Sequence, residues 1–416
     1  MILITMEYNV NERIGIRNIH EDMHMWHSIA QERIFSLAVG DRLGEIAPKI
    51  MEVGYAKVLY AADSLGSRTD DSFVFLAPDG TCSLNVERTR RGFAYGGLLD
   101  MDFDGLLATS NSMPNGCGFS VFEISDVEDG KLIRHLESSQ QNLGEDELSQ
   151  FGKGNHFAGV YRVCDPVSGE DTGRRLMVVH CSGHVGGDLL YYPDRWLSGE
   201  DGYHLVQTPH GPVTLLESDA REMYKTQFQK TEDANSLNRD KTAEEILGGL
   251  EWKRLSSITH QGLLPSRHLI GTQRSQGELP IAFNPEEGLA IVRSKPNLSK
   301  ECVAQWSEGW RVEELEIEKK IMNLNITPHG GGYELRFPFD SLRINLDSQG
   351  IESFDMSFLN QNLHFANFRE IRQWITYRRK LGIMYQILKY DLADHIYDLP
   401  PLMQVYPLKT VPGGSS

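Results

Sequence analysis

The chain has 416 residues, 40% of them hydrophobic, so it can bury a large core in one large domain or in two. Its formal net charge of −17 argues against non-specific adhesion to nucleic acid or to an anionic membrane, although a local basic groove remains possible. The five cysteines are too scattered for a disulfide framework, and no signal peptide or membrane-spanning apolar run is evident, so we expect a cytoplasmic protein with reduced thiols.

The first elements in chain order are helical and then extended. Apolar residues with helical spacing run from Glu21 to Ile46 and predict one or two helices that end before Pro48. A β-hairpin is predicted between Phe73 and Val86, with its turn at Pro78–Gly80. Short runs at 121–123 and 176–179 predict two further strands, the second of which enters His180 directly.

The second half begins with a polar segment. Residues 218–248 are rich in Gln, Lys, Glu and Asp, which predicts a helical surface insertion. Strands are predicted at 279–283 and 289–292, and the alternating pattern of residues 333–337 follows three consecutive glycines. Residues 368–395 predict a long helix, followed by an extended tail rich in proline.

Four short segments hold a possible metal ligand between glycines or at the end of a strand. Glycine permits tight turns and close backbone approach, so such segments can bring side chains to a shared centre and leave room for phosphate. Taken alone, each cysteine or histidine is more often a structural residue, and none shows the close spacing typical of a zinc motif. The segments are Pro114–Gly118 with Cys117, Gly154–Phe157 with His156, Val179–Gly187 with His180, and Pro328–Gly332 with His329.

Taken in order, these segments resemble the RtcB-type RNA-splicing ligases, which join RNA ends carrying a 3′-phosphate or 2′,3′-cyclic phosphate to a 5′-hydroxyl. The family's motifs are Asp-x-x-Cys-Gly, Gly-Asn-His-Phe, a His-x-Gly-Ser-Arg-like turn, a further histidine and a late His-Gly-Ala-Gly-Arg. Five motifs in the right order are hard to obtain by chance. In this chain they fall on Pro114–Gly118, Gly154–Phe157, His180–Gly187, His260 in Thr259–Gly262, and His329–Tyr333, while Arg267–Thr272, Asn284–Gly288 and Pro407–Lys409 match three weaker family segments.

The resemblance implies a metal site and a neighbouring nucleophile. The metal ligands would be the Cys117 thiolate and the imidazoles of His156, His180 and His260, binding one or two Mn²⁺ ions, with Zn²⁺ or Co²⁺ as possible alternatives. His329 would attack the α-phosphate of GTP to form a histidine-GMP phosphoramidate. The residues implied in GTP binding are Asn155, Asn284, Glu287, His329, Gly330, Gly331 and Lys409.

The resemblance also implies an α+β fold with central β-sheets, surrounding helices and a central cleft for metal and nucleotide. We therefore expect residues 1–416 to form a single large domain. Within it, residues 1–94 match the family only weakly, and residues 218–248 form the helical surface insertion. The expected partners are GTP and RNA with broken or spliced tRNA-like ends, and no association with a membrane is expected. The expected oligomeric state is a monomer or a weak oligomer.

Four substitutions depart from the family pattern. Pro114 stands where the family has a metal-binding aspartate, with the neutral oxygen donor Asn115 beside it, and Gly159 stands at a position that is often acidic. His184 and Tyr333 replace two arginines, whose bidentate phosphate contacts neither residue can reproduce.

Three hypotheses follow from these matches and departures. The first is a divergent GTP-dependent RNA ligase. The second is a paralogue that binds metal, nucleotide or RNA ends without ligating. The third is an unrelated metal hydrolase in which Cys117 and the histidines activate water and His329 acts as a general base.

Overall fold

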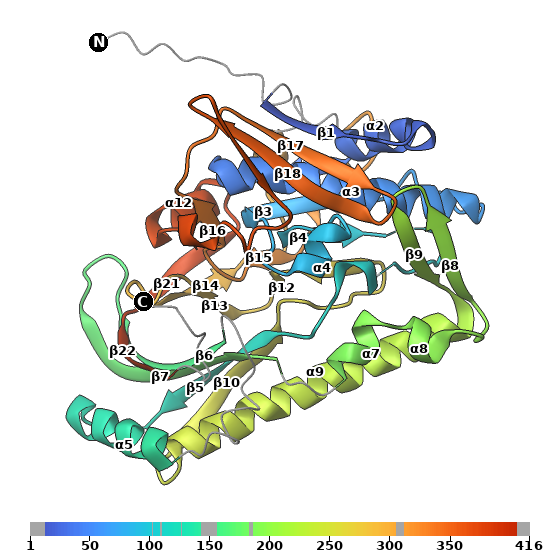
Figure 1. Cartoon of the computed structure of the whole chain (residues 1–416). Helices are drawn as coiled ribbons and strands as arrows, with labels where there is room; N and C mark the ends of the chain where they lie inside the picture. The colour runs from blue at the N-terminus through green and yellow to red at the C-terminus, as the bar shows by residue number, and fades with distance from the viewer. Residues whose placement is uncertain are drawn as a thin grey trace.

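The computed structural model describes residues 13–101, 103–108, 110–125, 127–142, 156–182, 186–304 and 312–405. Within these ranges the chain is mixed α+β, as predicted, with several sheets and surrounding helices (Figure 1). None of the helices in these ranges combines the length and the hydrophobicity needed to cross a lipid bilayer.

The N-terminal region contains strand β1 (Ile14–Arg17), η1 (Glu21–Met23), α2 (His24–Glu32), β2 (Ile34–Ser36) and α3 (Arg42–Ser64). Two helices are therefore confirmed, but a strand separates them, and α3 does not end before Pro48. Burial explains this error: Ile46, Ala47 and Ile50 around the proline are fully buried, and burial along α3 outweighs the single backbone hydrogen bond that Pro48 cannot make.

The predicted hairpin between Phe73 and Val86 is wrong. A single strand, β3 (Phe73–Thr81), runs through the expected turn with all nine residues buried, and Val86 starts helix α4 (Val86–Arg90). The register of β3 against β4 (Tyr95–Asp100) shifts between Leu76 and Thr81, so Pro78–Gly80 form an irregularity within the strand. Proline and glycine mark bulges as well as turns, and a buried segment cannot form a solvated turn.

The largest sheet carries most of the predicted strands. The strands at 121–123, 176–179 and 289–292 are confirmed within longer elements, the strand at 279–283 is confirmed one residue earlier in the chain, and β13 pairs antiparallel with β14. The order across the sheet is β10 (Trp252–Thr259), β5 (Gly118–Ile124), β7 (Asp171–Cys181), β6 (Phe157–Cys164), β21 (Ala393–Leu399), β14 (Leu289–Ser294) and β13 (Glu278–Ala282), with β22 (Pro401–Val405) also pairing with β6.

Two four-stranded sheets complete the main architecture. In the first, β3 lies between the parallel strand β2 and the antiparallel strand β4, which pairs with β11 (Arg267–Ile270). The second has the order β1, β17 (Ser341–Asp347), β18 (Gly350–Phe358) and β19 (Gln361–Phe365) and lies at the top of Figure 1. Because β1 pairs with β17, residues from both ends of the chain share one core.

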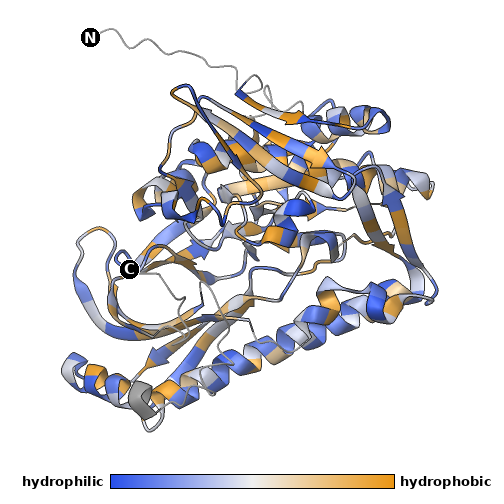
Figure 2. Cartoon of the chain, viewed as in Figure 1, coloured by the Kyte–Doolittle hydropathy of each residue, from blue (hydrophilic) through white to orange (hydrophobic). Residues whose placement is uncertain are grey.

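Helix α9 (Ser218–Leu247) confirms the predicted helix but differs from the expected surface insertion. It is mostly hydrophilic in Figure 2, yet one of its faces is buried. Several of the buried side chains are polar, so hydropathy alone did not reveal this face. The buried residues lie three or four positions apart and include Tyr224, Phe228, Thr231, Asn235, Arg239 and Thr242.

The predicted long helix at 368–395 is largely wrong. The segment contains η4 (Arg372–Trp374), β20 (Ile375–Tyr377), α12 (Lys380–Lys389) and the start of β21. Strand β20 pairs with β16 (Tyr333–Leu335), and β21 pairs with β14, so tertiary pairing overrides the local helical spacing. The remaining elements are η2 (Ser110–Ser112), α5 (Asp129–Asn142), α7 (Gly187–Tyr191), α8 (Asp194–Leu197), β8 (Tyr203–Thr208), β9 (Gly211–Leu216), β12 (Thr272–Arg274), α11 (Glu318–Met322) and β15 (Ile326–Pro328).

Candidate functional site

Cys117 lies immediately before β5, in a loop that its neighbours hold in place. The backbone N–H of Cys117 donates to the side-chain oxygen of Asn115 at 3.0 Å, and the backbone N–H of His260 donates to the Cys117 carbonyl at 2.9 Å. From α9, the side chain of Asn235 donates to the carbonyls of Asn115 and Gly116, each at 3.1 Å. The polar face of α9 therefore supports the loop that presents the thiol.

Three histidines come to this loop from neighbouring strands of the large sheet. His180 lies on β7, His156 directly precedes β6, and His260 follows the last residue of β10. In the register, Phe119 of β5 and Phe157 of β6 both pair with His180, so the three strands meet at this level. The predicted ligands are thus brought together, although up to 143 positions separate them (260 − 117).

The distances between these side chains fit a shared cation. The Cys117 sulfur lies 3.2 Å from Nε2 of His180 and 3.4 Å from Nε2 of His156. Two ligands of one tetrahedral ion, with metal–nitrogen distances near 2.0 Å and metal–sulfur distances near 2.3 Å, lie about 3.3–3.6 Å apart. The ligand atoms of Cys117, His180 and His260 all lie within 4.8 Å of one another, so this buried cluster can hold a metal ion.

Burial controls the protonation of the cluster. It lowers the pKa of His260 well below its usual value, and nearby His329 lowers it further, so the ring is a neutral ligand. The Nδ1 atom of His260 is buried and has no hydrogen-bond partner among the described residues. Burial, followed by the effect of Cys181, raises the pKa of the Cys117 thiol to about 12. A cation would stabilise the thiolate that burial disfavours, so the donor set fits a metal.

His329 lies next to this cluster, with its ring centroid 4.4 Å from that of His260. Its Nδ1 atom is 2.8 Å from Oδ2 of the fully buried Asp79, which also accepts the backbone N–H groups of His329 and Gly330 at 3.2 and 3.4 Å. An ionised carboxylate can only accept, so Nδ1 carries the proton and Nε2 keeps its lone pair. This arrangement suits a nucleophile or a general base.

The glycines after His329 allow a close backbone approach. Gly331 donates its N–H to the carbonyl of Ala282 at 2.8 Å, which ties the loop to the end of β13. Gly332 has a φ of +68°, and a Cβ there would lie 2.5 Å from the Asp79 carbonyl oxygen. No other residue fits at this position without a backbone shift.

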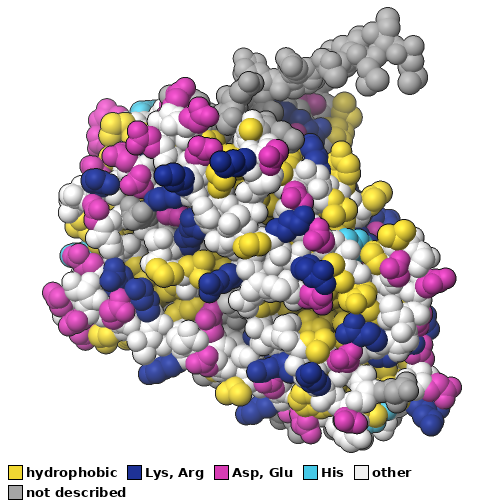
Figure 3. All heavy atoms as spheres, turned by 180° about the vertical axis from the view of Figure 1, so that it is seen from behind, with side chains coloured by type: hydrophobic (Ala, Val, Ile, Leu, Met, Phe, Trp, Pro, Cys, Tyr) yellow, Lys and Arg dark blue, Asp and Glu magenta, His cyan; other side chains and the backbone are white. Residues whose placement is uncertain are grey.

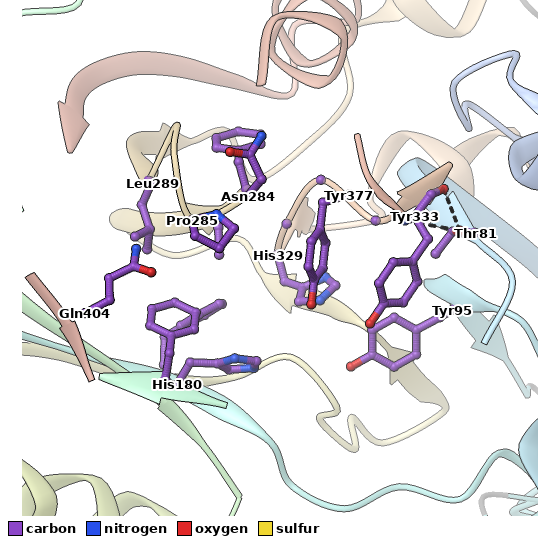
Figure 4. Close-up of a pocket in the computed structure, with 18 of the residues that line it drawn as sticks. Thr81, Tyr95, His180, Asn284, Pro285, Leu289, His329, Tyr333, Tyr377 and Gln404 are labelled. Carbon is purple, nitrogen blue, oxygen red and sulfur yellow. Dashed lines mark hydrogen bonds between the residues drawn. The ribbon is translucent and has the colours of Figure 1, made fainter. Parts of the chain in front are cut away.

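A cavity of about 130 Å³ opens over His180 and His329. Figure 4 shows both rings pointing into it, with Tyr95, Tyr333 and Tyr377 on one side and Asn284, Pro285, Leu289 and Gln404 on the other. This volume is comparable to a cavity that holds one benzene ring. A nucleotide is larger, so binding one requires the side chains at the rim to move.

The predicted nucleotide contacts are divided between the cavity and its surroundings. Asn284, Gly330 and Gly331 line the cavity. Glu287 lies behind Asn284, where its carboxylate accepts the Asn284 amide at 2.5 Å and the backbone N–H of Lys380 at 2.9 Å, so it stabilises the 284–288 loop. Asn155, Lys409 and His184 lie outside the described residues.

Two departures from the family motifs have a visible structural effect. Pro114 is buried and brings no oxygen ligand from its side chain, while the side-chain oxygen of Asn115 accepts the Cys117 N–H. At Gly159, a Cβ would lie 2.3 Å from the Tyr161 hydroxyl, so this tyrosine takes the space of a side chain at position 159. Neither Pro114 nor Gly159 offers a side-chain oxygen to a metal ion.

Tyr333 changes the other side of the cavity. Its ring centroid lies 5.0 Å from that of Tyr377, and its backbone N–H and carbonyl both bond to the Thr81 hydroxyl (Figure 4). Burial raises the pKa of its phenol well above the usual value, so the hydroxyl stays neutral. The Tyr333–Tyr377 aromatic pair thus forms this side of the cavity.

Two buried arginines, Arg378 and Arg88, already bond to oxygen acceptors of the protein. Arg378 is buried, and its guanidinium bonds to Asp41 and to the carbonyls of Gly80 and Gly331. Arg88 is also buried rather than solvated, and it holds the carbonyls of Ser112 and Met113. On the face shown in Figure 3, Lys and Arg side chains are interspersed with Asp and Glu, without a continuous basic tract.

Sequence reasoning missed three side chains that build the site. Asp79 lay in the supposed turn, Asn235 in the supposed surface helix, and Tyr95 was not considered. A buried Asp next to proline and glycine has no distinctive local pattern. For Asn235, the three- and four-residue spacing of Tyr224, Phe228 and Thr231 was the available signal.

No known protein-family model matches the chain, and a search of curated proteins finds no significant match.

Proposed function

We propose that the chain is a GTP- and manganese-dependent RNA ligase of the RtcB type, which joins 3′-phosphate or 2′,3′-cyclic phosphate RNA ends to 5′-hydroxyl ends. The observation that supports this most is the pairing of a nucleophile with a metal-type cluster: His329, oriented by Asp79, lies against His260 of the Cys117–His180–His260 group. The glycines that follow His329 allow the backbone to approach a phosphate group next to this histidine.

In the proposed reaction, Nε2 of His329 attacks the α-phosphorus of GTP. A nitrogen–phosphorus bond forms, the bond to the β-phosphate oxygen breaks, and pyrophosphate leaves. Water opens a 2′,3′-cyclic phosphate to the 3′-phosphate. An oxygen of the 3′-phosphate then attacks the guanylate phosphorus, which breaks the nitrogen–phosphorus bond and frees His329. Finally, the 5′-hydroxyl loses its proton and attacks the activated 3′-phosphate, forming the phosphodiester and expelling GMP. A divalent cation held by Cys117, His156, His180 and His260 would neutralise charge on the transferring phosphoryl group.

Within the protein, Asp79 keeps Nδ1 of His329 protonated and, after attack, stabilises the positive charge on the ring. Gly330 and Gly331 let the backbone approach the phosphates. Manganese, GTP and RNA come to the proposal from the family resemblance, since donor affinity alone would favour zinc over manganese.

The decisive experiment is incubation with Mn²⁺ and α-labelled GTP. We expect an acid-labile label on the protein that is lost in the His329→Ala variant. The label should be kept in the control variant His364→Ala, which changes an exposed histidine on β19. Equal labelling of His329→Ala would overturn the assignment. Joining of a 3′-phosphate RNA to a 5′-hydroxyl RNA then tests the second half of the reaction.

The second candidate is a paralogue that binds metal, nucleotide or RNA ends without ligating. It is favoured by the lining of the cavity, because no described residue that lines it is Lys, Arg, Asp or Glu. Enzymes that transfer a charged phosphoryl group normally use Lys or Arg side chains to stabilise its negative charge. Bound metal and nucleotide without a labelled protein or a joined product would support this candidate over the ligase.

A further inference from the structure

A second cavity, of about 320 Å³, lies apart from the one over His329 and shares no lining residue with it. It is bordered by α3, α4, the segment between α7 and α8, and the β8–β9 hairpin, and its lining is mainly polar. Neither the family resemblance nor the proposed reaction uses it. The lining residues that matter here are Lys57, Arg90, Arg91, Asn111, Tyr192 and Asp194.

Lys57 is the unusual member of this lining. It lies in the middle of α3 and is only 2% exposed. Among the described residues, its ammonium group has neither a hydrogen-bond partner nor an ion-pair partner, and the cavity is where its side chain ends. A buried ammonium without a partner is costly, so a lysine kept in this position indicates a ligand that supplies the missing negative charge.

The other charges around Lys57 are largely matched. From α4, Arg91 bonds to Glu87 at 2.9 Å, and Arg90 lies 3.4 Å from Asp347 at the end of β17. Asp194 accepts the hydroxyls of Tyr203 and Thr214 at 2.6 and 3.2 Å. An incoming anion therefore meets three cations and the carboxylates of Glu87 and Asp194, and of the cations Lys57 alone lacks an acidic partner among the described residues.

The protonation of Lys57 agrees with this view. Burial, and next the charge of Arg91, lower its pKa to about 7, while Glu87 and Asp347 oppose the shift. The pKa of His210, which lies between β8 and β9, is lowered mainly by burial, and the charge of Lys57 contributes to this shift. Near neutral pH the amine is therefore about half protonated, and a bound anion would draw a proton onto it.

We propose that this cavity is a phosphate-binding site, in which Lys57, with Arg90 and Arg91, holds a phosphate group that is either free or the terminal phosphate of a nucleotide chain. Asn111 and Tyr192 offer an amide and a hydroxyl to the remaining phosphate oxygens. The cavity can hold a phosphate together with part of a nucleoside, given its volume.

The test compares Lys57→Met with the unmodified chain and with the matched control Lys253→Met, an exposed lysine on β10. Calorimetric titration with inorganic phosphate at pH 7 is expected to show binding that weakens by at least about tenfold in Lys57→Met and is unchanged in Lys253→Met. Circular dichroism establishes that each variant folds. Equal phosphate affinity of Lys57→Met, or no binding to the unmodified chain, would overturn the site.

A second measurement does not depend on any variant. Sulfate keeps its charge between pH 6 and pH 8.5, so its affinity for the unmodified chain should fall by about tenfold or more as Lys57 loses its proton. A pH-independent sulfate affinity would contradict the proposal.

A third measurement distinguishes the source of the phosphate by comparing a trinucleotide that carries a 3′-phosphate with the same trinucleotide carrying a 3′-hydroxyl. Tighter binding of the former than of inorganic phosphate indicates a nucleic-acid end, and equal binding indicates free phosphate.

Discussion

Nδ1 of His329 and Oδ2 of Asp79 are 2.8 Å apart, although 250 positions separate the two residues in the chain. This contact selects the tautomer of the histidine, whose ring centroid lies 4.4 Å from that of His260 in the Cys117–His180–His260 group. The chemistry proposed for the site depends on it.

Asp79→Asn should leave the fold intact and lower the rate of labelling by GTP about 10²- to 10⁴-fold. The asparagine amide would donate to Nδ1 and shift the proton of His329 to Nε2, which removes the nucleophilic lone pair. The rate of label formation in single-turnover assays measures this effect. Asp70→Asn, at an exposed carboxylate, is the control, and equal rates in the two variants would refute the orienting role of Asp79.

Cys117→Ala should lose bound metal, whereas Cys181→Ala should keep it. Both cysteines are buried near His180, but Cys181 faces the opposite side of the sheet, in a hydrophobic cluster with Met177 and Val179. Elemental analysis after dialysis is expected to show at least about a tenfold loss of metal affinity in Cys117→Ala only. A chelator should also lower the melting temperature of the unmodified chain. Similar metal content in both variants would argue against the thiolate ligand.

Asn235→Ala should destabilise the loop that carries Cys117. It leaves two backbone carbonyls, of Asn115 and Gly116, without their donor, at a cost of about 1–3 kcal/mol in the free energy of unfolding. Denaturant unfolding gives this value, and metal titration should show weaker binding. Gln229→Ala on the exposed face of α9 should change stability by less than about 0.5 kcal/mol. If both variants behaved alike, α9 would have no special role at the site.

Tyr333→Arg should strengthen GTP binding about 10- to 100-fold, because a guanidinium at the rim can form charge-assisted hydrogen bonds to phosphate. Tyr333→Phe keeps the ring that packs on Tyr377 and is expected to show no gain. Equilibrium binding of GTP in the presence of Mn²⁺ compares the variants. If Tyr333→Arg bound GTP no more tightly than the unmodified chain, the phosphates of GTP would not lie next to residue 333.

The buried Lys57 should make stability depend on pH. Its pKa is about 7 in the folded chain and 10.5 for an ordinary solvated lysine, so between these two pH values the unfolded chain holds more protons. The free energy of unfolding therefore rises with pH across this range, by at most about 1.4 kcal/mol per pH unit. Below pH 7 the full cost of burial is present. Lys57→Met should remove the rise, as measured by urea unfolding in buffers without phosphate or sulfate; an unchanged slope would contradict this assignment.

The sequence was a good guide where a pattern is local. The strands at 121–123, 176–179, 279–283 and 289–292 and the helix after Ser218 are confirmed because short apolar runs and helix-forming residues act within their own segment. It was a poor guide for Pro78–Gly80 and for residues 368–395, where pairing with distant strands decides the conformation.

By itself, the sequence marked candidate site residues through residue type, glycine context and the order of the motifs: Cys117, His156, His180 and His260 as metal ligands and His329 as the nucleophile. Only the tertiary structure decided that Cys117, His180 and His260 lie around one centre, that His156 contacts Cys117, and that Asp79 orients His329. The physical reason is that strand register and helix packing act between residues far apart in the chain, and no local pattern records them.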